Sequence, residues 1–204
     1  MIRKLLLTSV ALSMSTVAFA QDVTVLRIGL DGSENEADQL RRTECVAEPL
    51  KAATGVSDVQ FFPSPDYNGI IQGLLGGTID IAIMGASSYA AIYLQDPEAV
   101  DPILTTQQED GSTGYYSIMV ARKDSGIKTL ADAKGKKLGF ADPDSTSGYL
   151  APNVSLPKDI GMPVKQYFAS SDFGGGHENL VLGVLDKKFD VGTTFGSGTG
   201  DWSQ

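Results

Sequence analysis

Short apolar, β-branched runs alternate along this chain with helix-like stretches, and this alternation restricts the possible folds more than any other feature. Residues 23–30, Val-Thr-Val-Leu-Arg-Ile-Gly-Leu, predict a strand. Residues 59–62 predict a second strand and residues 79–84 a third, buried one, with a helix at 67–75 between them. Strands that alternate with helices build βαβ units, so the sequence predicts an α/β fold on a largely parallel sheet.

The stretch after the first predicted strand carries a helix start signal. Ser33 is followed three residues later by Glu36, which is the spacing of a capping box. The helix that it predicts contains Pro49, which should kink or end it.

The second half of the chain repeats the same alternation. Its predicted strands are residues 114–121, 137–141, 166–168 and 189–193. Helices are expected around 130–134 and at 178–185. The polar, glycine-containing stretch 107–114 separates two similar halves and predicts a hinge. We therefore expect two α/β lobes, residues 21–110 and 111–204, with a cleft between them.

The N-terminus has the three parts of a secretory signal peptide. Arg3 and Lys4 form a basic start, an uncharged apolar segment follows, and residues 18–20 read Ala-Phe-Ala. The apolar segment contains several Ser and Thr residues and is too short for a transmembrane helix. The pattern predicts export, with cleavage after Ala20.

Charge and rare residues exclude several classes of protein. The chain has 16 Lys and Arg against 25 Asp and Glu, a formal net charge of −9, which is the wrong sign for a nucleic-acid binder. One cysteine, Cys45, cannot form an intramolecular disulfide, and one histidine, His177, cannot supply a zinc ligand cluster. We expect no metal and no cofactor.

The strongest local signal is a run of three hydroxyl residues, Ser145, Thr146 and Ser147, between a predicted strand and a helix. Such a turn presents free backbone N–H groups and the positive end of a helix dipole, and both favour an anion. A plain helix cap needs only one Ser or Thr. The spacing alone leaves an anion site and a cap equally open.

Four motifs, in order along the chain, carry a resemblance to a known family. They are residues 65–73 (Pro-Asp-Tyr-Asn-Gly-Ile-Ile-Gln-Gly), 111–117 (Gly-Ser-Thr-Gly-Tyr-Tyr-Ser), 142–150 (Asp-Pro-Asp-Ser-Thr-Ser-Gly-Tyr-Leu) and 176–179 (Gly-His-Glu-Asn). The chain resembles the periplasmic phosphonate-binding, PhnD-like proteins of ABC importers. The resemblance implies a two-lobed, type II-like periplasmic binding protein that closes on a phosphonate, phosphite or phosphate and delivers it to a membrane permease.

The same resemblance implies a set of ligand-binding residues. They are the hydroxyls of the turn, two tyrosines and the histidine: Ser145, Thr146, Ser147, Tyr67, Tyr115 and His177. Tyrosine and neutral histidine donate hydrogen bonds without a fixed charge, and a dianion beside histidine favours its protonated form. Taken without the resemblance, the tyrosines read as half-buried aromatics and the histidine as a helix-start residue.

The chain departs from the family in two respects. It ends short of the usual family length, and the segment beyond normally completes the first lobe, so we expect that lobe to be incomplete. Where relatives that bind aminoalkyl phosphonates carry an acidic residue, this chain has Ser197, unless the loop brings Asp201 there instead. Recognition of an ammonium group is therefore not expected from Ser197.

Two other functions remain open at this point. A secreted hydrolase would use Ser145 or Ser147 as nucleophile and His177 as base, but the sequence lacks a Gly-x-Ser-x-Gly elbow and an evident acidic partner. A non-transporting sensor lobe or degenerate fragment is the third hypothesis. We expect a binding protein without catalytic activity.

Overall fold

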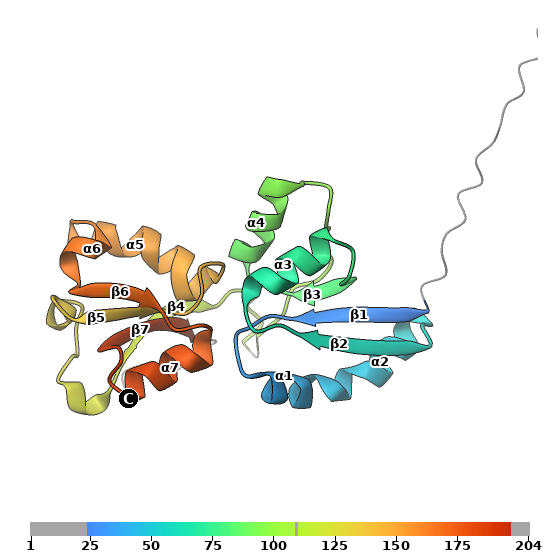
Figure 1. Ribbon diagram of the computed structural model, residues 1–204, viewed down its shortest axis with the longest axis horizontal. Coiled ribbons are helices and arrows are strands. Elements are labelled where there is room, and N and C mark those ends of the chain that lie inside the picture. The colour runs from blue at the N-terminus through green and yellow to red at the C-terminus, as the bar shows by residue number, and fades with distance from the viewer. Residues whose placement is uncertain (1–23, 109, 197–204) are drawn as a thin grey trace, which may run out of the picture.

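The computed structural model describes residues 24–108 and 110–196, which form two α/β lobes lying side by side (Figure 1). Each lobe has its own sheet with helices on both faces. The predicted two-lobed α/β fold is confirmed. The predicted signal peptide, residues 1–20, lies outside the described residues, as do Ser197 and Asp201.

The first lobe is built on a three-stranded parallel sheet in the order β2-β1-β3. Its strands are β1 (Val25–Leu30), β2 (Asp58–Pro63) and β3 (Ile81–Ile83). Its helices are α1 (Glu36–Thr43), the 3₁₀ turn η1 (Glu44–Val46), α2 (Ala47–Thr54), α3 (Tyr67–Leu75) and α4 (Ala86–Gln95). Because the strands are parallel, the loops after them leave the same edge of the sheet, which is where α/β proteins bind ligands.

The second lobe has a four-stranded sheet in the order β4-β7-β5-β6, with β4 antiparallel to β7 and the other pairs parallel. Its strands are β4 (Tyr116–Ala121), β5 (Lys137–Phe140), β6 (Ser170–Phe173) and β7 (Val191–Gly196). Its helical segments are η2 (Lys123–Ser125), η3 (Ala131–Ala133), the π-helical turn η4 (Thr146–Leu150), α5 (Ala151–Ile160), α6 (Val164–Tyr167) and α7 (His177–Leu185). The turn η4 runs directly into α5, so the two make one continuous helix.

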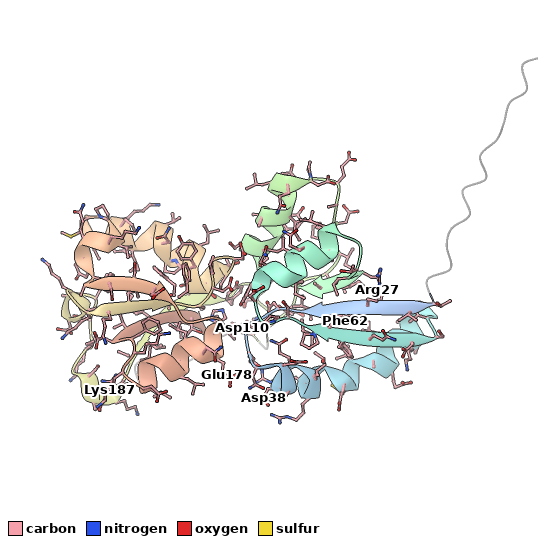
Figure 2. All side chains as sticks on the ribbon, viewed as in Figure 1. Arg27, Asp38, Phe62, Asp110, Glu178 and Lys187 are labelled. Atoms are coloured by element: carbon pink, nitrogen blue, oxygen red, sulfur yellow. The ribbon has the colours of Figure 1, made fainter. Side chains whose placement is uncertain are left out.

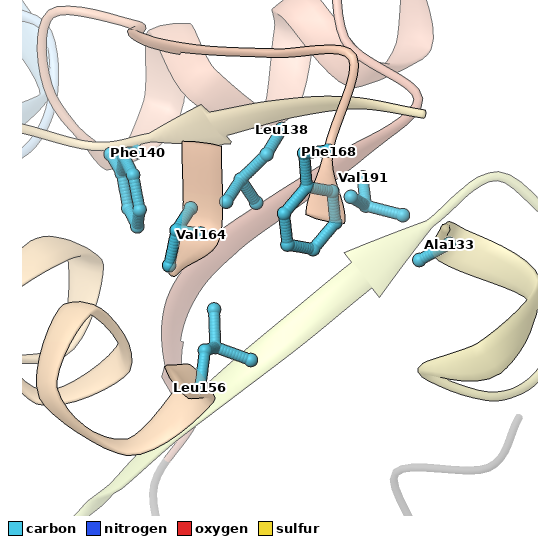
Figure 3. Packing of buried hydrophobic residues seen from close by; sticks show 7 residues of the cluster. All are labelled: Ala133, Leu138, Phe140, Leu156, Val164, Phe168 and Val191. Carbon is cyan, nitrogen blue, oxygen red and sulfur yellow. The ribbon is translucent and has the colours of Figure 1, made fainter. Parts of the chain in front are cut away.

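The hydrophobic core of the second lobe is the larger of the two. One cluster packs the sheet against α5 and α6 (Figure 3), and its members are Ala133, Leu138, Phe140, Leu156, Val164, Phe168 and Val191. The first lobe has a smaller cluster of Leu26, Ile28, Leu30 and Val59. Burial of these apolar side chains is the main stabilising contribution in each lobe.

Several sequence predictions are confirmed and others are wrong at their boundaries. The helices predicted at 67–75 and 178–185 are α3 and α7, the second starting one residue earlier. The capping box is wrong, because the cap of α1 is Asn35, whose side chain accepts from the Asp38 N–H at 3.1 Å. The interruption expected at Pro49 is found just before it, where the 3₁₀ turn η1 separates α1 from α2. Pro49 does not end α2. It lies in the first turn of α2, where a missing N–H costs nothing.

Three further segments differ from prediction. Residues 166–168, predicted as strand, fall largely in α6, and the strand follows at β6. The helix expected around 130–134 is the single 3₁₀ turn η3. The third strand is not buried, because β3 is an edge strand and Ile83 is 67% exposed. Among the described helices, none is both long and apolar enough to cross a membrane.

Candidate functional site

Four helices begin where the two lobes meet. α3 starts at Tyr67 and α4 at Ala86 in the first lobe, while η4 starts at Thr146 and α7 at His177 in the second. The Thr146 Oγ1 accepts from the N–H of Ser87, 2.8 Å away, which joins the starts of η4 and α4. The ring centroids of Tyr67 and His177 lie 6.5 Å apart, which brings the starts of α3 and α7 close to each other. Helix N-termini carry partial positive charge, so their convergence favours an anion.

The three hydroxyls of the turn have different roles. Ser145 is the cap of η4, and its Oγ accepts from the Gly148 N–H at 3.1 Å. Thr146 reaches across to α4, as described above. The Ser147 side chain is 4% exposed, and within residues 24–108 and 110–196 its hydroxyl has no hydrogen-bond partner. Capping therefore explains only one of the three hydroxyls.

His177 is held on both sides of its ring. The Nε2 atom lies 3.1 Å from the Ser145 Oγ, and the Nδ1 atom lies 2.9 Å from the Thr194 Oγ1. The residue is 6% exposed, and this burial lowers the pKa of His177 to about 4. The imidazole is therefore neutral at pH 7 before a ligand binds, and a bound anion would move its pKa upward from that low value.

Tyr67 brings a phenol from the first lobe to the second. The side chain is 5% exposed, and burial raises its pKa, with the nearby Asp31 carboxylate adding to the rise. A hydrogen bond with Ser145 acts in the opposite direction and is the smaller effect. The phenol therefore stays protonated and is available as a donor.

Tyr115 is 45% exposed, in contrast to the buried Tyr67. A Cβ added to Gly85 would lie 3.5 Å from the Tyr115 hydroxyl and 2.6 Å from the Thr146 Oγ1. Gly85 precedes α4, so the absence of a side chain there lets the second lobe approach the start of that helix. The six predicted residues are thus brought together, and Tyr115 is the most exposed of them.

Carboxylates lie close to these donors. Asp142 is 6% exposed, and burial raises its pKa, although its Oδ1 accepts from the Asp144 N–H at 2.8 Å. Burial also raises the pKa of Asp31, whose Oδ1 accepts from the Ser33 N–H at 3.2 Å. The nearby Arg42 guanidinium is paired with Glu34 at 2.8 Å. Among the described residues, neutral hydroxyls, backbone amides and an imidazole make the contacts that hold this site.

Contacts between the lobes surround the site. The N–H groups of His177 and Glu178 donate to the Ser33 carbonyl at 3.0 and 3.1 Å. The Glu178 carboxylate accepts from the Asn35 backbone N–H at 2.7 Å and from its side-chain amide, and Figure 2 shows Glu178 on the side of α7 that faces α1. The Ser88 Oγ donates to the Asp144 carbonyl at 3.0 Å. The two lobes therefore lie closed on one another.

Sequence reasoning missed three participants. Thr194 and Gly85 have no motif that marks them, although each lies at or near the end of a strand. Ser87 contributes only a backbone N–H, which any residue would supply. Within the described part of the chain, no group of three or more His, Cys, Asp or Glu side chains is placed to hold a metal ion.

The chain matches, over residues 28–201, the family described as the periplasmic substrate-binding protein of the phosphonate ABC transporter, and it belongs to that family. This is a family of binding proteins and not of enzymes.

Individual relatives agree with the family. The phosphate-import protein PhnD of Mycolicibacterium smegmatis is 30% identical over 189 residues, covering 90% of this chain and 58% of the relative. The phosphonates-binding periplasmic protein of Escherichia coli is 34% identical over 176 residues, covering 82% and 49%. The chain thus spans about half the length of these curated relatives.

Solved structures support the same fold. A binding protein component of an ABC phosphonate transporter from Pseudomonas aeruginosa has a TM-score of 0.73 at 30% identity, covering 86% of this chain and 58% of that one. PhnD1 from Prochlorococcus marinus, in complex with methylphosphonate, has a TM-score of 0.73 at 22% identity, covering 84% and 64%. The second likeness concerns the fold alone.

Proposed function

We propose that this chain is the solute-binding component of an ABC importer and that it binds a phosphonate, phosphite or phosphate between its lobes. The observation that carries the proposal is the convergence of four helix starts at Tyr67, Ala86, Thr146 and His177. Beside them lies the Ser147 hydroxyl, which has no hydrogen-bond partner among the residues that the structure describes. Dipoles and neutral donors bind an oxyanion without a fixed cation.

The proposed contacts come from both lobes. Tyr67 and Tyr115 donate from their phenols, and the hydroxyls of Ser145, Thr146 and Ser147 donate from the turn. His177 is the sixth member of the proposed set. A hydrogen bond to a charged ligand contributes about 1.5–3 kcal/mol, so a few such donors dominate the affinity. The lobes proposed to close on the ligand are residues 21–110 and 111–204.

The relatives support a phosphorus oxyanion as the ligand. The names of two of them refer to phosphate import and to phosphonate binding, and one solved neighbour holds methylphosphonate. Transport also implies a membrane permease as partner and export through the signal peptide of residues 1–20, with cleavage after Ala20. These steps belong to the proposal, as does delivery of the ligand to the permease.

The hydrolase hypothesis has one favourable distance and two unfavourable features. The Ser145 Oγ and the His177 Nε2 are 3.1 Å apart, as in a nucleophile and its base. The other ring nitrogen faces the Thr194 hydroxyl and no carboxylate, and a pKa of about 4 makes His177 a weak base at pH 7. The family match supports binding over hydrolysis and over a sensor role.

Thermal unfolding of residues 21–204 with a panel of ligands tests the proposal. The panel is 2-aminoethylphosphonate, methylphosphonate, phosphite, phosphate and sulfate. A ligand at 100 times its Kd adds about 2.7 kcal/mol, which raises the Tm by roughly 5–10 °C in a protein of this size. We expect at least one phosphorus oxyanion to raise the Tm.

A pair of matched variants locates the binding. Ser147→Ala removes the buried Ser147 hydroxyl, whereas Ser155→Ala removes an exposed hydroxyl from α5. We expect the ligand-induced rise in Tm to shrink in Ser147→Ala and to persist in Ser155→Ala. A panel in which no phosphorus oxyanion raises the Tm of the unmodified chain contradicts the proposed function.

A further inference from the structure

Each ring nitrogen of His177 lies within hydrogen-bond distance of a side-chain hydroxyl. Its Nε2 is 3.1 Å from the Ser145 Oγ and its Nδ1 is 2.9 Å from the Thr194 Oγ1. All three side chains are buried: Ser145 is 1% exposed, His177 6% and Thr194 7%. A neutral imidazole donates from one nitrogen and accepts at the other, so the neighbours decide which nitrogen carries the proton.

Thr194 fixes that choice. Within residues 24–108 and 110–196, the only hydrogen-bond partner of its hydroxyl is the Nδ1 of His177. If Nδ1 carried the proton, the Thr194 hydroxyl would accept that proton and its own O–H would have no acceptor. Buried donors without acceptors are strongly disfavoured. The Thr194 O–H therefore donates to Nδ1, and the imidazole proton lies on Nε2.

The proton on Nε2 then determines the direction of the Ser145 hydroxyl. The Ser145 Oγ has two acceptor positions. One accepts from the Gly148 N–H at 3.1 Å, and the other accepts from the His177 Nε2 at 3.1 Å. The Ser145 proton is then not directed at either of these two groups and is left for another acceptor, such as a bound anion.

We propose that Thr194 is a positioning residue which, through the tautomer of His177, turns the Ser145 hydroxyl into a donor aimed at the bound oxyanion. This inference rests on the proposed function, because the oxyanion is the ligand that the donor would meet. It gives His177, besides its place among the proposed ligand contacts, an action through Ser145. A donor oriented before binding costs no reorganisation when the ligand arrives, and this preorganisation raises affinity.

Besides Ser145 and Thr194, few groups near the His177 ring can influence its protonation. Tyr67 of α3 faces the ring with centroids 6.5 Å apart, and Phe195 of β7 lies at 5.0 Å. The neighbouring Glu178 carboxylate is turned toward Asn35. Burial is the cause of the low pKa of His177.

Nitrogen NMR of the single histidine tests the inference directly. The chain contains one His, so a ¹⁵N-labelled protein without a polyhistidine tag gives one pair of imidazole nitrogen signals, one for Nδ1 and one for Nε2. We expect the proton on Nε2 in the unmodified chain. A proton on Nδ1 overturns the proposal, whatever the ligand affinity.

The Thr194→Val variant tests the direction of the hydrogen bond. If the Thr194 hydroxyl donates to Nδ1, it stabilises only the neutral ring, because the charged ring carries a proton on Nδ1. Removal of that hydroxyl therefore raises the pKa of His177. An acceptor from Nδ1–H also stabilises the charged ring, so its loss would lower the pKa. We expect a rise in Thr194→Val, and a pKa near the original in Thr194→Ser, which keeps the hydroxyl. A fall in Thr194→Val overturns the proposal.

Titration with methylphosphonate and with phosphate separates this inference from the proposed function. We expect Thr194→Val to weaken binding about tenfold and Thr194→Ser to restore most of the affinity. Thr193→Val is the matched control, because it removes a neighbouring buried hydroxyl that donates to Gly148 and not to His177. We expect the pKa of His177 to be unchanged in Thr193→Val.

The results of that titration fall into distinct cases. Binding by the unmodified chain with equal affinity in Thr194→Val overturns the positioning role and leaves the proposed function intact. Failure of the unmodified chain to bind any phosphorus oxyanion overturns both, while the NMR result still reports the tautomer.

Discussion

The second lobe has the larger core and most of the candidate site, whereas the most exposed large apolar side chains of the described residues lie in the first half of the chain. Seven buried residues form the main cluster of the second lobe, against four in the first. In the first half, Leu104 is 91% exposed, Leu94 84% and Ile83 67%. Five of the six candidate site residues, all except Tyr67, belong to the second half of the chain, residues 111–204.

This difference assigns separate tasks to the lobes. Ser145 and His177 need fixed surroundings because they are buried polar groups whose hydrogen bonds depend on one geometry. The better-packed lobe supplies those surroundings. The first lobe contributes the Tyr67 phenol and the backbone groups that close on the second, such as the Ser33 carbonyl. We infer that the second lobe contributes most of the free energy of unfolding, and that the first lobe contributes the groups that close onto it.

Two leucine truncations test where stability is concentrated. Leu138 is 0% exposed in β5, and Leu26 is 7% exposed in β1 of the smaller core. Truncation of a buried leucine to alanine costs about 2–5 kcal/mol. We expect Leu138→Ala near the upper end of that range and Leu26→Ala near the lower end, measured by denaturant unfolding. An equal or larger loss for Leu26→Ala contradicts the comparison.

The pH dependence of stability tests the buried histidine of the second lobe. The pKa of His177 falls from 6.5 to about 4 on folding, so the unfolded chain takes up the proton first as the pH drops. Stability is therefore fully present above pH 6.5 and is lost between pH 6.5 and 4, by roughly 3 kcal/mol at most.

A His177→Gln variant isolates this effect from the carboxylates. The raised pKa values of Asp31 and Asp142 act in the opposite direction as the pH falls, and they are present in both chains. We expect the unmodified chain to lose stability relative to His177→Gln between pH 6.5 and 4. Parallel curves for the two chains count against a buried neutral imidazole.

A glycine pair tests closure by the first lobe. Gly176 has φ of 101°, and a Cβ there would lie 2.3 Å from the Gly32 carbonyl oxygen across the lobe boundary. Gly161 has φ of 70° with nothing within 4 Å of an added Cβ. We expect Gly176→Ala to cost about 2–3 kcal/mol and to separate the lobes, and Gly161→Ala to cost about 1 kcal/mol without separation.

Denaturant unfolding and the radius of gyration from solution scattering measure the two effects of the glycine variants. A Gly176→Ala chain as compact and as stable as Gly161→Ala would show that close approach at Gly32 is unimportant for closure.

The sequence predicted local features well where a local signal exists. The helix at 67–75 was predicted with its observed bounds, because Asp66 provides a cap and the apolar spacing is regular. The turn at Ser145 was predicted as either a cap or an anion site. Ser145 is observed as the cap of η4, whereas the anion site stays a prediction that rests on Thr146 and Ser147, which do not cap that helix. The choice of Ser33 as a cap failed because Asn35 lies closer to the true helix start.

Contacts between distant residues were not predictable from spacing. Thr194 meets His177 only because β7 and α7 pack together, and Gly85 meets Thr146 only because the lobes close. The strand predicted at 166–168 failed for a related reason, since Tyr167 and Phe168 pack into the core from a short helix and its end. A short helix and a strand that are each buried on one face can carry the same apolar residues, so a short apolar run does not distinguish them.

Titration calorimetry of Thr146→Val against the unmodified chain with methylphosphonate and phosphate tests the central claim most directly. The claim is that donors at the meeting point of the lobes bind a phosphorus oxyanion, and Thr146 is a predicted ligand residue whose hydroxyl also contacts the other lobe. We predict saturable binding by the unmodified chain and binding weakened at least about tenfold in Thr146→Val. The variant still unfolds cooperatively, with a stability lowered by about 1–3 kcal/mol because the Ser87 N–H loses its acceptor. Unaltered affinity in a folded Thr146→Val chain would contradict the account.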